Sequence, residues 1–157
     1  MSNFEIAVRE WLRQNDIDCD ISFAEDFGYD VANNTLQIGT IAHEQIATWF
    51  EQFLYEYGME YYGILHPVLS CIHEIGHYFT IKYFSLEEQL MLELAKMFID
   101  ADSECEFMNK YWEIPDEFAA NIWAVNFINS HIEAVEGLCY IYIDFWNDFL
   151  KERKVAA

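Results

Sequence analysis

Two histidines four positions apart, His73 and His77, constrain the fold of this chain more than any other feature. An α-helix places the side chains of residues i and i+4 one above the other on the same face. Apolar residues recur around the two histidines at helical spacing: Val68, Ile72, Ile75, Phe79 and Tyr83. The pattern predicts a helix that this stripe anchors in the core and that carries both imidazoles beside it.

The composition favours one mainly helical domain. The 157 residues include only six Gly and two Pro, so little turn material is available, and 54% of the residues are hydrophobic. A chain of this length can bury a core without disulfide support. We expect an α+β fold, mainly helical, with residues 1–157 forming a single domain.

Capping signals and periodicity locate the elements. Ser2 with Glu5 forms a capping box, which opens a helix to about Gln14. Alternation over residues 21–23 and 36–38 predicts two short strands of a small antiparallel sheet. An amphipathic helix over residues 46–57 stops at Gly58, and Pro67 fits the first turn of the histidine helix.

The second half of the chain is predicted to be helical, with one break. Ser85 with Glu88 forms another capping box, which opens a helix to about Asp100. Residues 102–111 are acidic and are predicted to be irregular. Pro115 starts a further helix, and the last helix covers about residues 132–150.

The charge is strongly one-sided. Twenty-eight acidic residues face eight basic ones, for a formal net charge of −20, and residues 14–81 hold eleven Asp and Glu but no Lys or Arg. Such a field repels nucleic acid and favours basic partners. The charge is interpreted either as a soluble acidic surface or as a surface that attracts a basic protein, by recognising it as substrate or by imitating DNA.

Cysteine usage and hydropathy predict a cytoplasmic protein with no membrane contact. The four cysteines are scattered singly and form no CxxC pair, which argues against a cysteine-based zinc site: Cys19, Cys71, Cys105 and Cys139. No apolar run reaches the roughly 18 residues of a membrane span. The N-terminus lacks the basic start and apolar stretch of a secretory signal.

The segment His73-Glu74-Ile75-Gly76-His77 is an HExxH motif, whose spacing suits zinc chemistry. Both imidazoles can reach one zinc ion at about 2.0–2.1 Å. Glu74, one step round the helix, is placed to act as general base on a zinc-bound water. Gly76 costs about 1 kcal/mol of helix propensity relative to Ala, which indicates that another element packs closely against this helix. Two core histidines satisfied by hydrogen bonds are the competing interpretation.

A catalytic zinc usually has a third protein ligand, for which Glu117 is the best candidate. Pro115 puts Glu117 in the opening turn of its helix, and the small residues Ala120 and Ala124 on the same face allow close approach. Asn121, one turn later, could accept the free N–H of a ligating histidine. Rival ligands are less well placed: Asp100, Asp102, Glu104, Glu106, Glu113 and His131.

These residues resemble a known family. HEIGH followed by E-x-x-A-N-x-x-A, from Glu117 to Ala124, is similar to the small gluzincin metallopeptidases of the ImmA/IrrE type, which are common on phages and mobile elements. The resemblance implies a minimal zincin-like domain in which His73, His77 and Glu117 hold zinc, Glu74 is the base and Asn121 an outer partner. The chain departs from the family in residues 125–128, where a Leu-Met-Pro segment is usual, and in an extra helix between His77 and Glu117.

The leading hypothesis is therefore a zinc-dependent metallopeptidase acting on a specific intracellular protein or peptide, with a basic substrate favoured by the acidic surface. Three residues remain candidates for stabilising the oxyanion: Tyr78, Tyr111 and His131. The alternative is an acidic, zinc-stabilised binding protein that sequesters a basic partner, or mimics DNA, without catalysis. The sequence assigns no oligomeric state.

Overall fold

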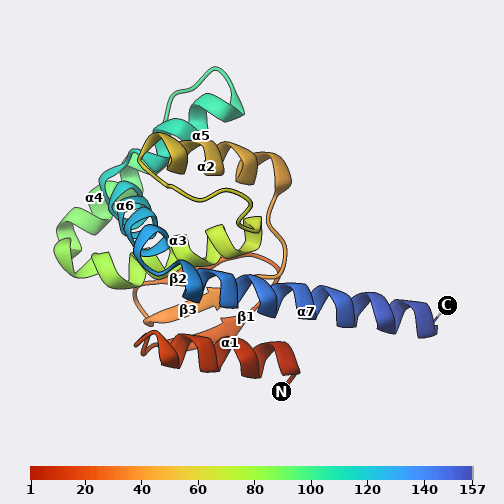
Figure 1. The fold of residues 1–157 in the computed structure, drawn as a ribbon. Coiled ribbons are helices and arrows are strands. Elements are labelled where there is room, and N and C mark those ends of the chain that lie inside the picture. Colours follow the sequence, from red (N-terminus) through yellow and green to blue (C-terminus); the bar gives the residue numbers. More distant parts are fainter. Residues whose placement is uncertain (157) are drawn as a thin grey trace.

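The computed structural model describes residues 1–156 and is mainly helical with one small sheet (Figure 1). The elements in chain order are α1 Asn3–Gln14, β1 Asp20–Phe23, β2 Gly28–Asp30, β3 Thr35–Ile38, α2 Glu44–Glu56, α3 His66–Thr80, the 3₁₀ turn η1 Ile81–Tyr83, α4 Leu86–Met97, α5 Glu104–Trp112, α6 Pro115–Ser130 and α7 Ile132–Ala156.

The predicted capping signals are confirmed. In both capping boxes the serine hydroxyl accepts from the backbone N–H of the glutamate, and the glutamate carboxylate accepts from the serine N–H: Ser2 with Glu5, and Ser85 with Glu88. The two prolines lie in the first turns of α3 and α6, where the missing N–H has no intrahelical partner to lose. Local chemistry therefore sets the start of four helices.

The predicted antiparallel pairing of the two strands is wrong. β1 and β3 pair in parallel, and a third strand, β2, pairs antiparallel to β3, so the sheet is mixed with the order β1-β3-β2. The chain returns along β2 and reverses at Asn34, whose φ of 46° suits a tight turn. Because β2 makes this return, β3 runs in the same direction as β1.

Two local predictions are also corrected. Residues 104–112 form helix α5, because the hydroxyl of Ser103 caps the N–H of Glu106. Tyr83 is 70% exposed, since α3 ends at Thr80 and η1 turns the chain away from the core.

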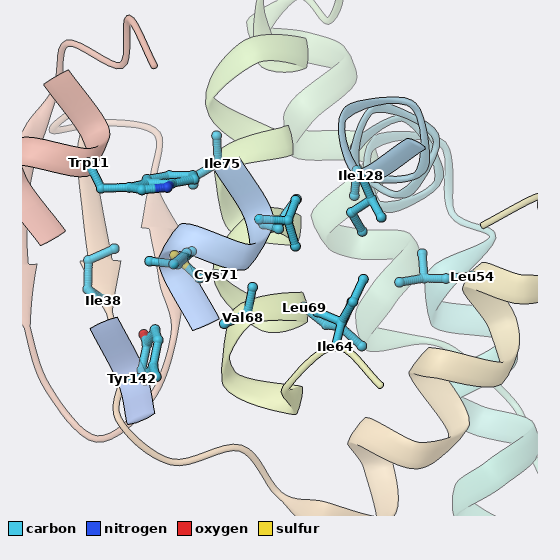
Figure 2. Close-up of a cluster of buried hydrophobic side chains, with 14 of the residues drawn as sticks. Trp11, Ile38, Leu54, Ile64, Val68, Leu69, Cys71, Ile75, Ile128 and Tyr142 are labelled. Atoms are coloured by element: carbon cyan, nitrogen blue, oxygen red, sulfur yellow. The ribbon is translucent and has the colours of Figure 1, made fainter. Parts of the chain in front are cut away.

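Helix α3 is the centre of the hydrophobic core. The sheet lies between α1 and α3 in Figure 1, and the rings of Phe4 and Phe23 meet edge to face at 6.1 Å between α1 and β1. Figure 2 shows α3 side chains with Trp11 and Ile38 on one side and Ile128 on the other. Full burial stabilises each aliphatic side chain by about 1.5–3 kcal/mol, so the predicted stripe fixes the orientation of α3.

Among the described residues, no helix combines the length and the apolar character that crossing a membrane requires. All four cysteines are free thiols.

Candidate metal centre

The close packing of α3 on α6 positions the site. A Cβ built on Gly76 would lie only 2.5 Å from the carbonyl oxygen of Ala120, so a larger residue would push the helices apart. Ala120 and Ala124 are fully buried in this contact. The glycine and the two alanines therefore bring the opening turn of α6 against the histidine face of α3, as their small size predicts.

Glu117 reaches both histidines. Nε2 of His73 lies 3.1 Å from Oε1 of Glu117, and Nε2 of His77 lies 2.9 Å from Oε2. His73 and Glu117 are buried, and the side chain of His77 is only 12% exposed. The carboxylate of α6 thus bridges two imidazoles that the sequence places one turn apart on α3.

These donors fit a zinc ion. Ligand atoms at about 2.0–2.1 Å from a tetrahedral zinc lie about 3.3 Å from one another. The separations of 2.9 and 3.1 Å, which involve different oxygens of Glu117, are close to that spacing. Two imidazoles with one carboxylate form a ligand set known from catalytic zinc sites, so the chemistry of the three side chains suits zinc.

Asn121 orients the first histidine. Its Oδ1 lies 2.7 Å from Nδ1 of His73, and its amide nitrogen donates to the carbonyl of Trp112 at 3.3 Å. Asn121 is fully buried, so this arrangement is held away from water. With Nδ1–H donated to Asn121, Nε2 of His73 is turned toward Glu117, as expected for an outer partner of a metal ligand.

Both ring nitrogens of His73 face oxygen acceptors, which favours the charged imidazolium. Burial by itself lowers the pKa of His73, but the hydrogen bond and the charge of Glu117, with the charge of Glu74, outweigh it and raise the pKa to about 9. For Glu117, burial opposes ionisation, while hydrogen bonds from His73 and His77 hold its pKa well below the usual range. The carboxylate of Glu117 is therefore ionised, as a metal ligand must be.

Glu74 stands beside the ligand atoms without joining their hydrogen bonds. Its Oε1 lies 3.9 Å from Nε2 of His73, and its side chain is 18% exposed. One ligand atom from each of His73, Glu74 and His77 falls within a single cluster 4.8 Å across. The carboxylate of Glu74 therefore belongs both to this cluster of potential ligands and to the lining of the adjoining cavity.

That cavity has a volume of about 330 Å³ and opens beside His73, Glu74 and Glu117. Much of its wall is apolar, formed by Phe27, Ile41, Ile46, Phe50 and Met108. Its lining includes three carboxylates, those of Asp26, Glu74 and Glu117. No Lys or Arg is found among the described residues that line it. The cavity therefore suits an apolar or basic side chain.

Of the three oxyanion candidates, Tyr111 alone lines this cavity. Tyr78 exchanges hydrogen bonds with the backbone of Asp18, and the ring of His131 stacks on Phe127. Burial and the nearby charge of Glu117 raise the pKa of Tyr111, so its hydroxyl keeps the proton that a donor needs. Of the three candidates, Tyr111 is therefore the one whose side chain lies at the cavity beside Glu74.

Lys96 is the residue that sequence reasoning missed. Its Nζ lies 2.7 Å from Oδ2 of Asp116 and 3.0 Å from Oε2 of Glu117, and its side chain is only 12% exposed. Asp116 in turn accepts the backbone N–H of Glu117 through Oδ1. Lys96 comes from α4, twenty or more residues away in sequence, so no local spacing signals this contact.

The rival ligands have other partners. Glu113 accepts from the hydroxyl of Tyr57, and Glu106 accepts from the N–H of Asp102 and pairs with Lys110. The remaining acidic rivals, Asp100, Asp102 and Glu104, lie at the surface. Asp116, which sequence reasoning did not consider as a ligand, groups with His77 and Glu117 in a second cluster of potential metal ligands.

The geometry defines the class of site as a candidate metal centre at a cavity, with two overlapping clusters of potential ligands: His73, Glu74 and His77, and His77, Asp116 and Glu117. No protein-family model, curated protein or solved structure matches this chain.

Proposed function

We propose that the protein is a zinc-dependent metallopeptidase with a minimal zincin-like fold, similar in its site to peptidases of the ImmA/IrrE type. The observation that carries the proposal is the convergence of His73, His77 and Glu117, with Glu74 beside His73 at the same cavity. Two core histidines alone would not explain a buried carboxylate bonded to both and a second carboxylate beside them.

In this proposal His73, His77 and Glu117 hold the ion, and Asn121 keeps His73 in the ligating orientation. Zinc bound there would polarise a peptide carbonyl and lower the pKa of water toward about 7. Glu74 accepts the proton of the attacking water and delivers it to the leaving amine. The hydroxyl of Tyr111 donates to the carbonyl oxygen as negative charge develops on it.

The cavity supports a protein or peptide substrate with an apolar or basic side chain at the cleavage site. Its apolar wall can take a large side chain, and its acids favour a cation over an anion. The net charge of −20 attracts a basic protein and repels nucleic acid at longer range.

Metal analysis and one substitution test the proposal. Protein expressed with added zinc should contain about one zinc per chain, and less than about half an equivalent would contradict the site. Glu74→Gln should keep the zinc, since Glu74 is not proposed as a ligand, but should abolish cleavage of a peptide library followed by mass spectrometry. Glu113→Gln, a surface change at the C-cap of α5, is the matched control and should keep both zinc and cleavage.

The acidic charge also supports a second candidate function, a zinc-stabilised binder of a basic protein that performs no catalysis. A pure binder should be unaffected by Glu74→Gln, whereas a peptidase should lose its activity. Binding that is mainly electrostatic should weaken steeply between low and physiological ionic strength, because salt screens exposed charges over about 8–10 Å.

A further inference from the structure

Helix α4 exposes nearly all its apolar side chains. No α4 residue is buried, and α4 contributes no residue to the hydrophobic core cluster within the described chain. Six large apolar residues of α4 and its C-cap are between 52% and 78% exposed: Leu86, Leu90, Met91, Leu94, Met97 and Phe98. We call these six residues the α4 apolar face.

The α4 apolar face is a stripe that Glu87 interrupts near the N-terminal end. At about 100° per residue its members occupy an arc of about 140°, a width that normally faces a core. The opposite side, with Gln89, Leu92 and Lys96, is turned toward the protein. Figure 1 shows α4 at the periphery, away from the free end of α7. Its capping box and the ion pairs of Lys96 hold the helix there in place of core burial.

The exposed area is large enough for a specific interface. Six side chains at this exposure offer on the order of 800 Å², close to one partner's share of a standard interface. Single exposed apolar residues need no explanation, but a contiguous patch of this size marks an interaction surface. Two of the six residues are methionines, whose flexible side chains adapt to a partner.

A hollow of about 650 Å³ extends this surface toward the candidate metal centre. One wall is formed by Leu86 and Leu90 of α4, and the other by the turn after β2, including Val31. Its acids are Asp30, Glu93 and Asp116, of which Glu93 and Asp116 pair with Lys96 of α4, while Asp30 is in no ion pair among the described residues. The apolar face thus continues into a groove with an acidic border.

Charge identifies the kind of partner. A second copy of the chain would bring two bodies of net charge −20 together, with Glu87 and Glu88 in the first turn of each α4. We propose that the α4 apolar face and the adjoining hollow bind a basic amphipathic helix of a partner protein. The partner's apolar side packs on Leu90 and its neighbours, and its cations face Asp30 and Glu87. This binding requires neither metal nor catalysis.

A designed helical peptide of leucines on one face and lysines on the other is the probe, with binding measured by calorimetry on metal-free and zinc-loaded protein. The double variant Leu90→Glu, Leu94→Glu should weaken binding by about tenfold or more, because two apolar contacts are lost. Tyr140→Glu together with Ile6→Glu is the matched control: it adds the same charge at exposed apolar positions of α7 and α1 and should leave the affinity within about twofold. A peptide with serine in place of leucine should bind about tenfold more weakly or worse.

Two results would overturn the proposal. If the α4 variant and the serine peptide bind as tightly as the originals, the attraction is only that of general charge. If sedimentation shows a dimer of the unmodified chain that the α4 variant dissociates, the occupant is a second copy. All four substituted residues are exposed, so an unchanged thermal midpoint and circular dichroism spectrum will show that folding is intact.

Discussion

Replacing Gly76 with alanine should reduce both the stability of the protein and its affinity for metal, because the added methyl carbon would push apart α3 and α6, the two helices that form the site. The new Cβ would lie 2.5 Å from the carbonyl oxygen of Ala120, whereas ordinary contact begins at 3.4 Å, so α3 and α6 must separate by about 0.9 Å. Overpacking costs about 1–3 kcal/mol, and backbone cannot rotate away, so we take the upper end. Alanine's better helix propensity returns about 1 kcal/mol. The expected net loss is about 2 kcal/mol.

The same separation acts on the ligands. The 2.9 and 3.1 Å contacts of Glu117 with His77 and His73 would lengthen by a comparable amount, and zinc affinity should fall by about tenfold or more. Urea unfolding with a chelator present measures the free energy of unfolding, followed by the fluorescence of the buried tryptophans Trp11 and Trp112. Competition with a coloured chelator measures the zinc affinity.

Gly137 provides the matched control. It lies within α7, and a Cβ there would meet Trp11 at 3.9 Å, an ordinary contact. Gly137→Ala should therefore stabilise the protein by about 0.5–1 kcal/mol and leave zinc affinity unchanged. If Gly76→Ala raises the free energy of unfolding and leaves zinc affinity unchanged, as Gly137→Ala should, the close approach of α3 to α6 is refuted.

Three further predictions concern the groups around the ligands. Asn121→Ala should weaken zinc binding by about 10–100-fold, while Asn126→Ala on the exposed side of α6 should not; equal affinities would remove Asn121 from the site. Lys96→Met should destabilise the metal-free protein by about 3–5 kcal/mol, because it leaves Asp116 without its cation and Glu117 with the histidines alone, and zinc should then raise the melting temperature more than in the unmodified protein. Metal-free protein should lose stability as pH rises from about 6.5 through about 9, since the raised pKa of His73 stabilises the fold only while His73 is protonated; chemical unfolding across this range tests it, and His73→Gln should flatten the dependence.

Sequence reasoning worked where the signal is local. The capping boxes, the two prolines and the apolar stripe each depend on residues within a turn or two of one another, and they placed most helices. The approach of Glu117 to the histidines was also predictable, because Gly76, Ala120 and Ala124 all reduce the bulk between two helices. Small residues on one face of a helix therefore indicate, from the local sequence, that a distant helix packs closely there.

The sheet was predicted incorrectly because alternation identifies a strand without its direction. β2 has three residues, too few to show a period of two, and without β2 the parallel pairing of β1 with β3 could not be inferred. For α5, the signal was present but was outweighed by the acidic composition. Ser103 and Glu106 have the same spacing as Ser2 and Glu5, and Ser103 caps the helix in the same way.

Lys96 could not have been found from spacing, and its place in the site has a consequence for the loading of metal. Every buried side-chain nitrogen and oxygen in the described residues has a hydrogen-bond partner. His73, Asn121, Glu117 and Lys96 satisfy one another's hydrogen bonds. In the proposed peptidase, zinc would have to replace the contacts of Glu117 with the two histidines, so loading of the metal competes with Lys96 for the same carboxylate.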